Sequence, residues 1–417
     1  MRTALFALLS IALGLSAVFV CVEIGMRVMG ISYPIFFAPH PVAGARMWPG
    51  LKAWYTLEGE GFIEVNSVGF RDREHPKQKP EGVYRIAFLG DSYTEAMQVG
   101  FDEIYWNVAT RALQDCKALS GRKPVPMNFG LSGIGTAQQY EILRHFVAGQ
   151  EPNLVVLAFV SNDFYNNHPA YGGRDLKPFY LLDESGDLVL DDSFKTSSTF
   201  LGRISPSRTL RRSVLQSSRV LQLVVEVRAS MVRRASLRES QDRRGDLYRP
   251  PGTKLLREAW QITEALIVRM ADELASQGSD FLLFTVTSGH QVHPDPAYRI
   301  DRVSPGADLN YWNARLGKLA ERKGIDFVDL IPPLLSHVEA SGECLHGFEN
   351  AVPCGGHWNF RGHRLAGEEI ARAICLELES REKASRPRAG GRIGGLSIRR
   401  PYEPLRTSTQ KFRESIT

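Results

Sequence analysis

Apolar runs of strand length alternate along this chain with segments of helical length, and this alternation restricts its fold more than any other feature. The apolar runs are residues 84–90, 125–130, 153–160, 280–286 and 325–330. Segments with a helical pattern lie between several of them, such as 102–119 and 256–278. Strands buried on both faces and joined by helices form a parallel sheet that helices cover on each side. The sequence therefore predicts an α/β protein built on a parallel sheet.

Two stretches fall outside this alternation. Residues 31–80 are rich in Pro, Gly and aromatic residues, so we expect an irregular lead-in with short strands before a domain at 81–380. The interval 191–252 holds eleven arginines, three acidic residues and no lysine between Arg203 and Arg244, with apolar residues at helical spacing. We expect an inserted helical segment there. The sequence leaves open whether it is a cap packed on the domain or a basic face for anionic lipid head groups or an anionic polymer.

The positive charge is concentrated near the C-terminus. The chain has a formal charge of +5, but residues 381–417 alone carry ten Lys or Arg against three Asp or Glu. The rest of the chain is therefore slightly acidic, and we expect no nucleic-acid partner. The Gly-, Pro- and Arg-rich composition of 381–417 predicts a disordered basic tail.

The N-terminal region is apolar enough to cross a membrane. Thr3 to Val22 are 20 residues without a charge, which spans a bilayer core of about 30 Å. A secretion signal usually has an apolar region of about 7–15 residues followed by small residues at a cleavage site. No such site follows here, so we expect residues 1–30 to be a retained single-pass anchor. Arg2 would stay inside, which places the remaining chain in a bacterial periplasm.

Polar motifs follow the predicted strands. Ser92 in "GDSYTEA" follows the first strand, Gly133 in "GLSGIGT" follows the second and Asn162 in "SNDF" follows the third. His357 in "GGHWNF" precedes the last predicted helix. The carboxyl ends of parallel strands meet at one edge of a sheet. A serine, oxyanion donors and a histidine should therefore converge there, as acyl transfer requires.

In order and wording these motifs resemble the four blocks of the SGNH (GDSL-type) hydrolase superfamily. The resemblance covers about residues 84–376. It implies a flavodoxin-like three-layer α/β/α sandwich with a central parallel sheet, here with the inserted helical segment. The motif "VNSVGFRD" (Val65 to Asp72) and the apolar N-terminus are also similar to membrane-anchored bacterial members of that superfamily.

The resemblance assigns roles to four residues. It implies that Ser92 is the nucleophile and His357 its base, since histidine has a pKa suited to taking the serine proton at neutral pH. It implies that the backbone N–H groups of Ser92 and Gly133 and the side chain of Asn162 form the oxyanion hole. The rivals are Gly130 for Gly133 and His363 for His357, with an Asx-type turn at Asn162 and Asp163 as the structural alternative. Asp163 cannot donate a hydrogen bond while ionised.

The sequence departs from the superfamily at the third member of the triad. The family usually has an Asp two or three residues before its histidine, where this chain has Cys354 and Gly355. Three alternatives follow: another carboxylate, with Glu349 the nearest upstream; a Ser–His dyad oriented by a backbone carbonyl; or a degenerate site. Loss of the orienting acid of a triad can cost about 10⁴ in rate.

The sequence thus predicts an extracytoplasmic serine esterase or acyltransferase that works through an acyl-enzyme. Its expected substrate is an O-acyl ester, such as an acetyl ester, of a cell-envelope carbohydrate or lipid. The alternative is a catalytically degenerate domain that binds polysaccharide.

The nearest match to an α/β-hydrolase elbow, "GLSGI", has Ile134 in place of the second Gly. We expect no cofactor and no metal, because His290, His293 and Asp295 have no partner cluster in the sequence. The oligomeric state is not indicated.

Four cysteines lie beyond the anchor: Cys116, Cys344, Cys354 and Cys375. Outside the cytoplasm an even set is expected to pair. A bridge between Cys344 and Cys354 would stiffen the loop that presents His357. Cys116 and Cys375 fall on the first and last helices of the α/β core, where they would either pair or remain two buried thiols.

Overall fold

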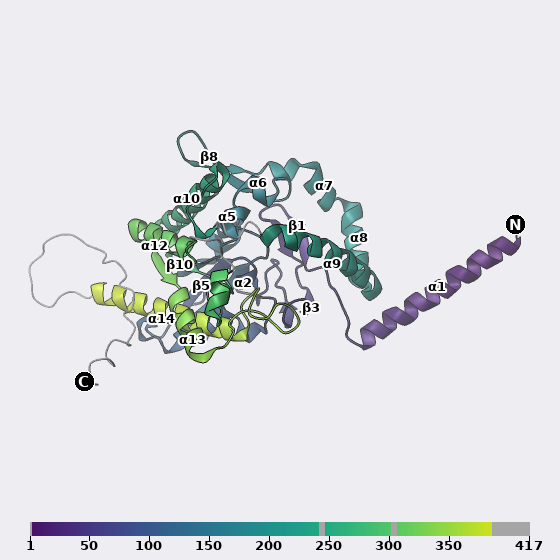
Figure 1. Cartoon of the computed structure of the whole chain (residues 1–417), viewed down its shortest axis with the longest axis horizontal. Helices are drawn as coiled ribbons and strands as arrows, with labels where there is room; N and C mark the ends of the chain where they lie inside the picture. The colour runs from purple at the N-terminus through teal and green to yellow at the C-terminus, as the bar shows by residue number, and fades with distance from the viewer. Residues whose placement is uncertain (1, 242–246, 302–306, 386–417) are drawn as a thin grey trace, which may run out of the picture.

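The computed structural model describes residues 2–241, 247–301 and 307–385, and a five-stranded parallel sheet lies at its centre (Figure 1). The strands are β5 (Val83–Gly90), β6 (Lys123–Gly130), β7 (Leu154–Phe159), β10 (Asp280–Thr285) and β11 (Asp326–Asp329). Their order across the sheet is β6–β5–β7–β10–β11. Counted along the chain this is 2-1-3-4-5, the flavodoxin-like order. The five predicted strands and the predicted fold class are confirmed.

Helices cover both faces of the sheet. One face carries α4 (Thr136–Ile142), α10 (Lys254–Ser276) and α12 (Tyr311–Lys323); the other carries α3 (Tyr105–Ala112), α13 (Ile331–Ser341) and α14 (Phe360–Ser385). Successive residues of a strand point to opposite faces. In β5, Ala87 and Leu89 therefore join the first layer, and Ile86 and Phe88 join the second. Both layers consist of buried apolar side chains packed on the sheet.

The lead-in before the sheet consists of two antiparallel hairpins that share its hydrophobic core. The hairpin strands are β1 (Phe37–His40), β2 (Gly44–Met47), β3 (Lys52–Tyr55) and β4 (Gly61–Glu64). Ile63 and Phe70 are buried against the first helical layer. The segment 65–72 fastens the hairpins to the sheet: buried Arg71 donates to the carbonyls of Ala96 and Val99, and the Asp72 carboxylate accepts from the backbone N–H of Asn128 at 2.7 Å.

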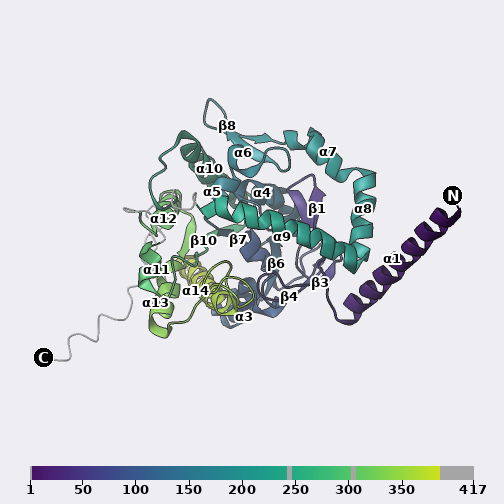
Figure 2. The same cartoon turned by 45° about the vertical axis from the view of Figure 1, so that its right-hand side comes forward.

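The predicted inserted helical segment is present between β7 and α10. It begins after the hairpin β8 (Phe179–Leu182) and β9 (Leu188–Asp191) and comprises α7 (Ser198–Ile204), α8 (Pro206–Ser217) and α9 (Arg219–Gln241). Shorter helices are α2 (Ser92–Glu95), α5 (Asp163–Asn166), α6 (Pro169–Gly172) and α11 (Pro296–Asp301). The N-terminal helix α1 (Arg2–Val28) projects from the body on the side of α8 and α9 (Figures 1 and 2).

Two segments bear on the expectations for the chain ends. Residues Thr3–Val28 form a helix whose most apolar 18-residue window has a mean hydropathy of 2.6 and no buried residue. A membrane span and a secretion signal both fit this length and composition. At the other end, residues 381–385 belong to α14, so the prediction of disorder is wrong for these five residues. Residues 386–417 of that predicted tail lie outside the described residues.

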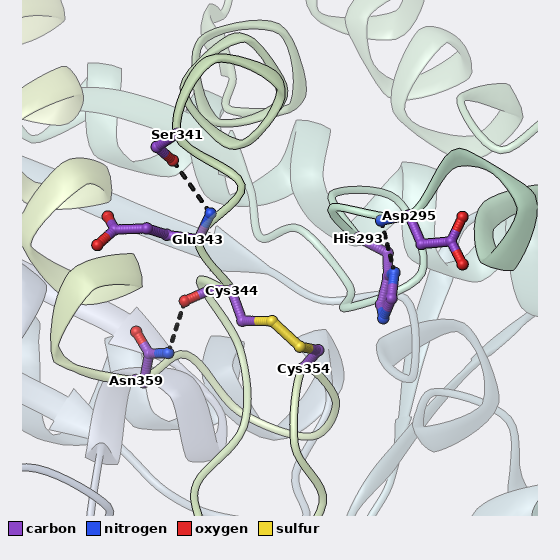
Figure 3. The surroundings of a disulfide bond; sticks show 7 residues. All are labelled: His293, Asp295, Ser341, Glu343, Cys344, Cys354 and Asn359. Carbon is purple, nitrogen blue, oxygen red and sulfur yellow. Dashed lines mark hydrogen bonds between the residues drawn. A yellow bond between two sulfur atoms is a disulfide. The ribbon is translucent and has the colours of Figure 1, made fainter.

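Both cysteine pairs are bonded. Cys116 follows α3 and joins Cys375 of α14, which ties two neighbouring helices of one layer. Cys344 joins Cys354 and closes the loop between α13 and α14 (Figure 3). Asn359, at the far end of this loop, donates to the Cys344 carbonyl at 2.9 Å. The predicted bridge before His357 is therefore present.

Candidate active site

Ser92 lies at the start of α2, directly after β5. The preceding Asp91 is buried, and its carboxylate caps this short helix by accepting from the backbone N–H of Tyr93 at 3.0 Å. Glycines make the close packing possible. A Cβ at Gly90 would lie 2.0 Å from Thr94 Oγ1, and one at Gly130 would lie 2.4 Å from the backbone nitrogen of Glu95. The ends of β5 and β6 therefore hold α2 directly against the sheet.

His357 reaches Ser92 from the loop before α14. Its Nε2 lies 2.8 Å from Ser92 Oγ, and its Nδ1 lies 2.6 Å from Oε2 of Glu58. The other carboxylate oxygen of Glu58 accepts from the backbone N–H of His357 at 2.8 Å. An ionised carboxylate only accepts, so Nδ1 carries the proton and Nε2 has its lone pair toward the serine hydroxyl. Ser92, His357 and Glu58 thus form one continuous chain of hydrogen bonds.

The charges of His357 and Glu58 support each other. Burial alone would lower the pKa of His357, but the hydrogen bond and the charge of Glu58 outweigh it and raise that pKa above its usual value. Burial alone would raise the pKa of Glu58, but its hydrogen bonds with His357 lower it below the usual value. Glu58 is therefore ionised at neutral pH, and it favours the protonated imidazole.

The residue beside His357 Nδ1 is another carboxylate, the first of the three alternatives considered from the sequence, but it is Glu58 and not Glu349. Glu349 is exposed on the disulfide-closed loop, and no backbone carbonyl takes this place. Glu58 is instead 299 positions earlier in the chain, in the turn between β3 and β4. The sequence around it, "YTLEGEGF", indicates a hairpin turn. Nothing in the local pattern tells that this turn reaches the sheet edge.

Asn350 locks the Glu58 turn onto the disulfide-closed loop. Its Oδ1 accepts from the Gly59 backbone N–H at 2.8 Å, and its Nδ2 donates to the carbonyls of Gly59 and Thr56 at 2.9 and 3.1 Å. Glycine is required where the two segments touch. A Cβ at Gly356, which has φ +75°, would lie 2.2 Å from Glu58 Oε1. The loop carrying the base and the turn carrying the acid therefore form one interlocked unit.

The loop of His357 is also braced from the sheet side. The Tyr93 hydroxyl donates to the Gly356 carbonyl at 2.9 Å, and its ring lies 4.8 Å from the ring of His357. His346 Nδ1 donates to the same carbonyl at 2.9 Å. Burial lowers the pKa of His346 to about 4, so this histidine is neutral and acts as a structural donor.

The predicted oxyanion residues lie on the rim next to Ser92. Gly133 is exposed and has a φ of +76°, in the left-handed region that glycine adopts readily. Asn162, also exposed, donates one amide hydrogen to Asp91 Oδ2 at 3.1 Å, which leaves its second amide hydrogen for a ligand. The rival Gly130 has its N–H engaged by Asn128 Oδ1 at 2.8 Å. The Gly130 N–H is therefore already engaged, and the role of Gly133 as a donor stays a prediction.

His363 and Asp163 are buried and hydrogen-bonded to groups other than Ser92. His363 is buried in α14, where its Nδ1 accepts from the Tyr105 backbone N–H at 3.4 Å, and burial lowers its pKa to about 3. Asp163 is buried at the start of α5 and accepts from the side chains of Thr136 and Gln139 at 3.3 and 3.4 Å. Burial raises the pKa of Asp163 well above its usual value. Both are packing residues in this fold.

The residues weighed as metal ligands do not converge. His293 Nδ1 accepts from the backbone N–H of Asp295 at 3.1 Å (Figure 3). The ring of His293 stacks on Tyr298. Within the described residues, no group of three His, Cys, Asp or Glu side chains is placed to hold a metal ion. The loop instead packs on the disulfide, since a Cβ at Gly289 would lie 2.6 Å from the Cys354 carbonyl oxygen.

Comparisons with known proteins give distant structural neighbours. No family model and no curated protein matches the chain. An acetyl xylan esterase, AlAXEase, matches with a TM-score of 0.37 at 15% identity, and the match covers 70% of this chain and 99% of the esterase chain. A putative GDSL-like lipase from Parabacteroides merdae has a TM-score of 0.39 at 12% identity, covering 72% and 100%. Similarity at this level carries no argument about the function of this chain. The function must therefore be argued from the geometry of the site.

Proposed function

We propose that this protein is a serine ester hydrolase of the SGNH (GDSL-type) kind. The observation that carries the proposal is the unbroken hydrogen-bond chain from Ser92 through His357 to Glu58, at 2.8 and 2.6 Å. A serine hydroxyl becomes an effective nucleophile when a base within this distance takes its proton and a third group orients the base. The case for a degenerate polysaccharide-binding domain rested on a missing acid, and Glu58 stands in that position.

The mechanism follows from these positions. Ser92 Oγ attacks the ester carbonyl while His357 Nε2 takes its proton, and the imidazolium is stabilised by Glu58. His357 then returns the proton to the leaving alkoxide, so that the C–O bond breaks and an acyl-enzyme forms. Water repeats the sequence and releases the acid; an acceptor hydroxyl in its place would make the enzyme an acyltransferase. The backbone N–H groups of Ser92 and Gly133 and the amide of Asn162 stabilise the oxyanion in both steps.

The substrate proposed is an O-acyl ester, such as an acetyl ester, of a cell-envelope carbohydrate or lipid. We further propose that a recess of about 320 Å³ beside the β3–β4 hairpin, whose turn carries Glu58, is a carbohydrate subsite. Trp54 and Phe62 are 49% and 40% exposed there, and Glu60, Glu64 and Glu103 line the same recess. Aromatic faces and carboxylate acceptors suit the apolar and hydroxyl faces of a sugar ring. The apolar helix α1 is proposed as a single-pass anchor that holds the catalytic domain in the periplasm.

The test is active-site labelling of the full chain with a fluorophosphonate probe. We expect one label per molecule, on Ser92, and none in Ser92→Ala. Ser341→Ala is the matched control, because Ser341 is exposed at the end of α13 and its hydroxyl donates to the His337 carbonyl, so its loss should leave labelling intact. Hydrolysis of p-nitrophenyl acetate should disappear with the label. Saccharide binding by a chain that neither labels nor hydrolyses would overturn the enzyme proposal.

A further inference from the structure

The inserted helices α7, α8 and α9 present apolar side chains to solvent. No residue of α8 is buried, and Leu210 is 68% exposed. Seven apolar side chains described on these helices are at least 44% exposed: Leu201, Ile204, Leu210, Val214, Val224, Val227 and Met231. Apolar patches of this kind are uncommon on soluble surfaces and mark interaction sites. These helices therefore offer a candidate interaction surface.

The same helices are strongly cationic. Residues 198–231 contain six arginines, one glutamate and no lysine. Arg203, Arg208 and Arg212 lie close enough to repel one another: burial, and then the charges of the other two, lower the pKa of Arg212 below its usual value. Arg212 also donates to the Arg203 carbonyl at 3.2 Å. An anionic partner would relieve this repulsion.

Helix α1 is docked on the corner between α8 and α9 (Figures 1 and 2). Glu23 of α1 accepts from the backbone N–H groups of Arg219 and Val220, both at 3.0 Å, at the start of α9. Arg27 donates to the Ser217 carbonyl at 2.6 Å, at the end of α8. The apolar helix α1 and the cationic helices α8 and α9 are therefore in direct contact.

We propose that α7, α8 and α9 rest on the surface of the bilayer that holds α1, with their arginines at anionic lipid head groups and their apolar side chains in the interface. This inference rests on the proposed anchoring of α1. Basic helices with apolar residues bind anionic bilayers through the burial of apolar area and the electrostatic attraction to lipid head groups together. A protein partner would need its own route to this corner, whereas the bilayer is already fixed there by α1.

A local probe tests contact with the bilayer independently of anchoring. Cys21 is the only unpaired cysteine among the described residues, so Cys21→Ser with Leu210→Cys gives one site for an NBD label. The full chain is placed in phosphatidylcholine vesicles with or without phosphatidylglycerol. With the anionic lipid, we expect NBD emission at shorter wavelength and several-fold weaker quenching by iodide. The effect should shrink at 1 M salt, where the Debye length is about 3 Å.

Two matched variants sharpen the result. A label at Lys323→Cys, exposed on α12, should stay fully quenchable in all vesicles. Reversing the charge of Arg203, Arg208 and Arg212 to Glu should return the Leu210→Cys label to water, while the chain still floats with the vesicles through α1. A chain that floats while its Leu210→Cys label stays as quenchable as the Lys323→Cys label overturns the inference. A chain that does not float overturns the anchor as well, and fluorophosphonate labelling reports separately on the active site.

Discussion

The candidate active site has two halves that are held in place by different means. Ser92 and Asn162 stand at the ends of buried parallel strands, and buried Asp91 joins them by capping α2 and orienting Asn162. His357 and Glu58 stand on loops outside the sheet. They are held by a disulfide, by Asn350 and by glycines that allow close approach. The first half is fixed by the core, and the second half is fixed by contacts between segments remote in sequence.

This difference separates two ways of damaging the site. A change in the sheet half disturbs the core, so stability and activity should fall together. A change in the loop half alters only the relation of base and acid to the serine, so activity should fall while the fold persists. Removing side chains one at a time from the loop half tests whether the halves are in fact independent.

The largest effect is expected for His357→Ala. Under the proposed mechanism this change removes the base, and kcat should fall by about 10⁴–10⁶ with little change in thermal stability. His363→Ala is the matched control. His363 is buried and neutral in α14, so its loss should lower the melting temperature and leave kcat of the folded fraction within a few-fold. If His363→Ala lost activity as completely as His357→Ala, with the fold intact, the assignment of the base would be wrong.

Glu58→Gln should have the next largest effect. Glutamine has nearly the same shape, but it cannot stabilise the imidazolium, so kcat should fall by about 10³–10⁴. Glu349→Gln is the control, since Glu349 is exposed and lies away from His357 Nδ1. Steady-state kinetics on a soluble ester measures both variants. Equal losses in the two variants would show that Glu58 is not the orienting acid.

The same variant has a signature in the pH profile. Glu58 raises the pKa of His357 against the opposing effect of burial. The imidazole accepts the serine proton only when it is neutral, so kcat/KM falls as the pH drops through that pKa. Removing the charge of Glu58 lowers the pKa, and the acid limb of Glu58→Gln should move to lower pH than that of the parent. A limb that stays in place would mean that Glu58 acts only by packing.

The contrast between the halves also explains what the sequence could predict. The strands, their order along the chain, and the positions of Ser92, Gly133 and Asn162 follow from local patterns, because each motif directly follows its own strand. No local pattern predicts the role of Glu58. Its position depends on a hairpin turn that precedes His357 by 299 residues in the sequence and packs against it in the fold. The nearest carboxylate in sequence, Glu349, is exposed and is not the partner of His357. Closeness in the sequence therefore does not identify the orienting acid when a segment remote in the sequence packs against the loop of the base.

The two disulfides should differ in what they protect. Cys116–Cys375 spans 259 residues and Cys344–Cys354 spans 10, which in the chain-entropy model corresponds to about 5.5 and about 2.7 kcal/mol. Changing the first pair to Ser should cost more in denaturant unfolding. Changing the second pair should cost more in kcat, about 10–10² fold, because the loop of His357 loosens. The opposite ranking of the two variants would show that the loop half does not depend on its own bridge.

Asn350→Ala should give the smallest of these effects and isolate the clamp itself. It removes three hydrogen bonds to the Glu58 turn without touching Ser92, His357 or the disulfide. Each such bond contributes about 0.5–1.5 kcal/mol, and part of that sum holds Glu58 against the imidazole. We expect kcat to fall about tenfold with KM unchanged, and the acid limb of the pH profile to move part of the way toward that of Glu58→Gln. Val352→Ala, an exposed change in the same loop, should alter neither quantity. If Asn350→Ala kept the parent's kcat and pH profile, the turn would hold Glu58 without the clamp, and the acid would depend on the packing of the β3–β4 hairpin alone.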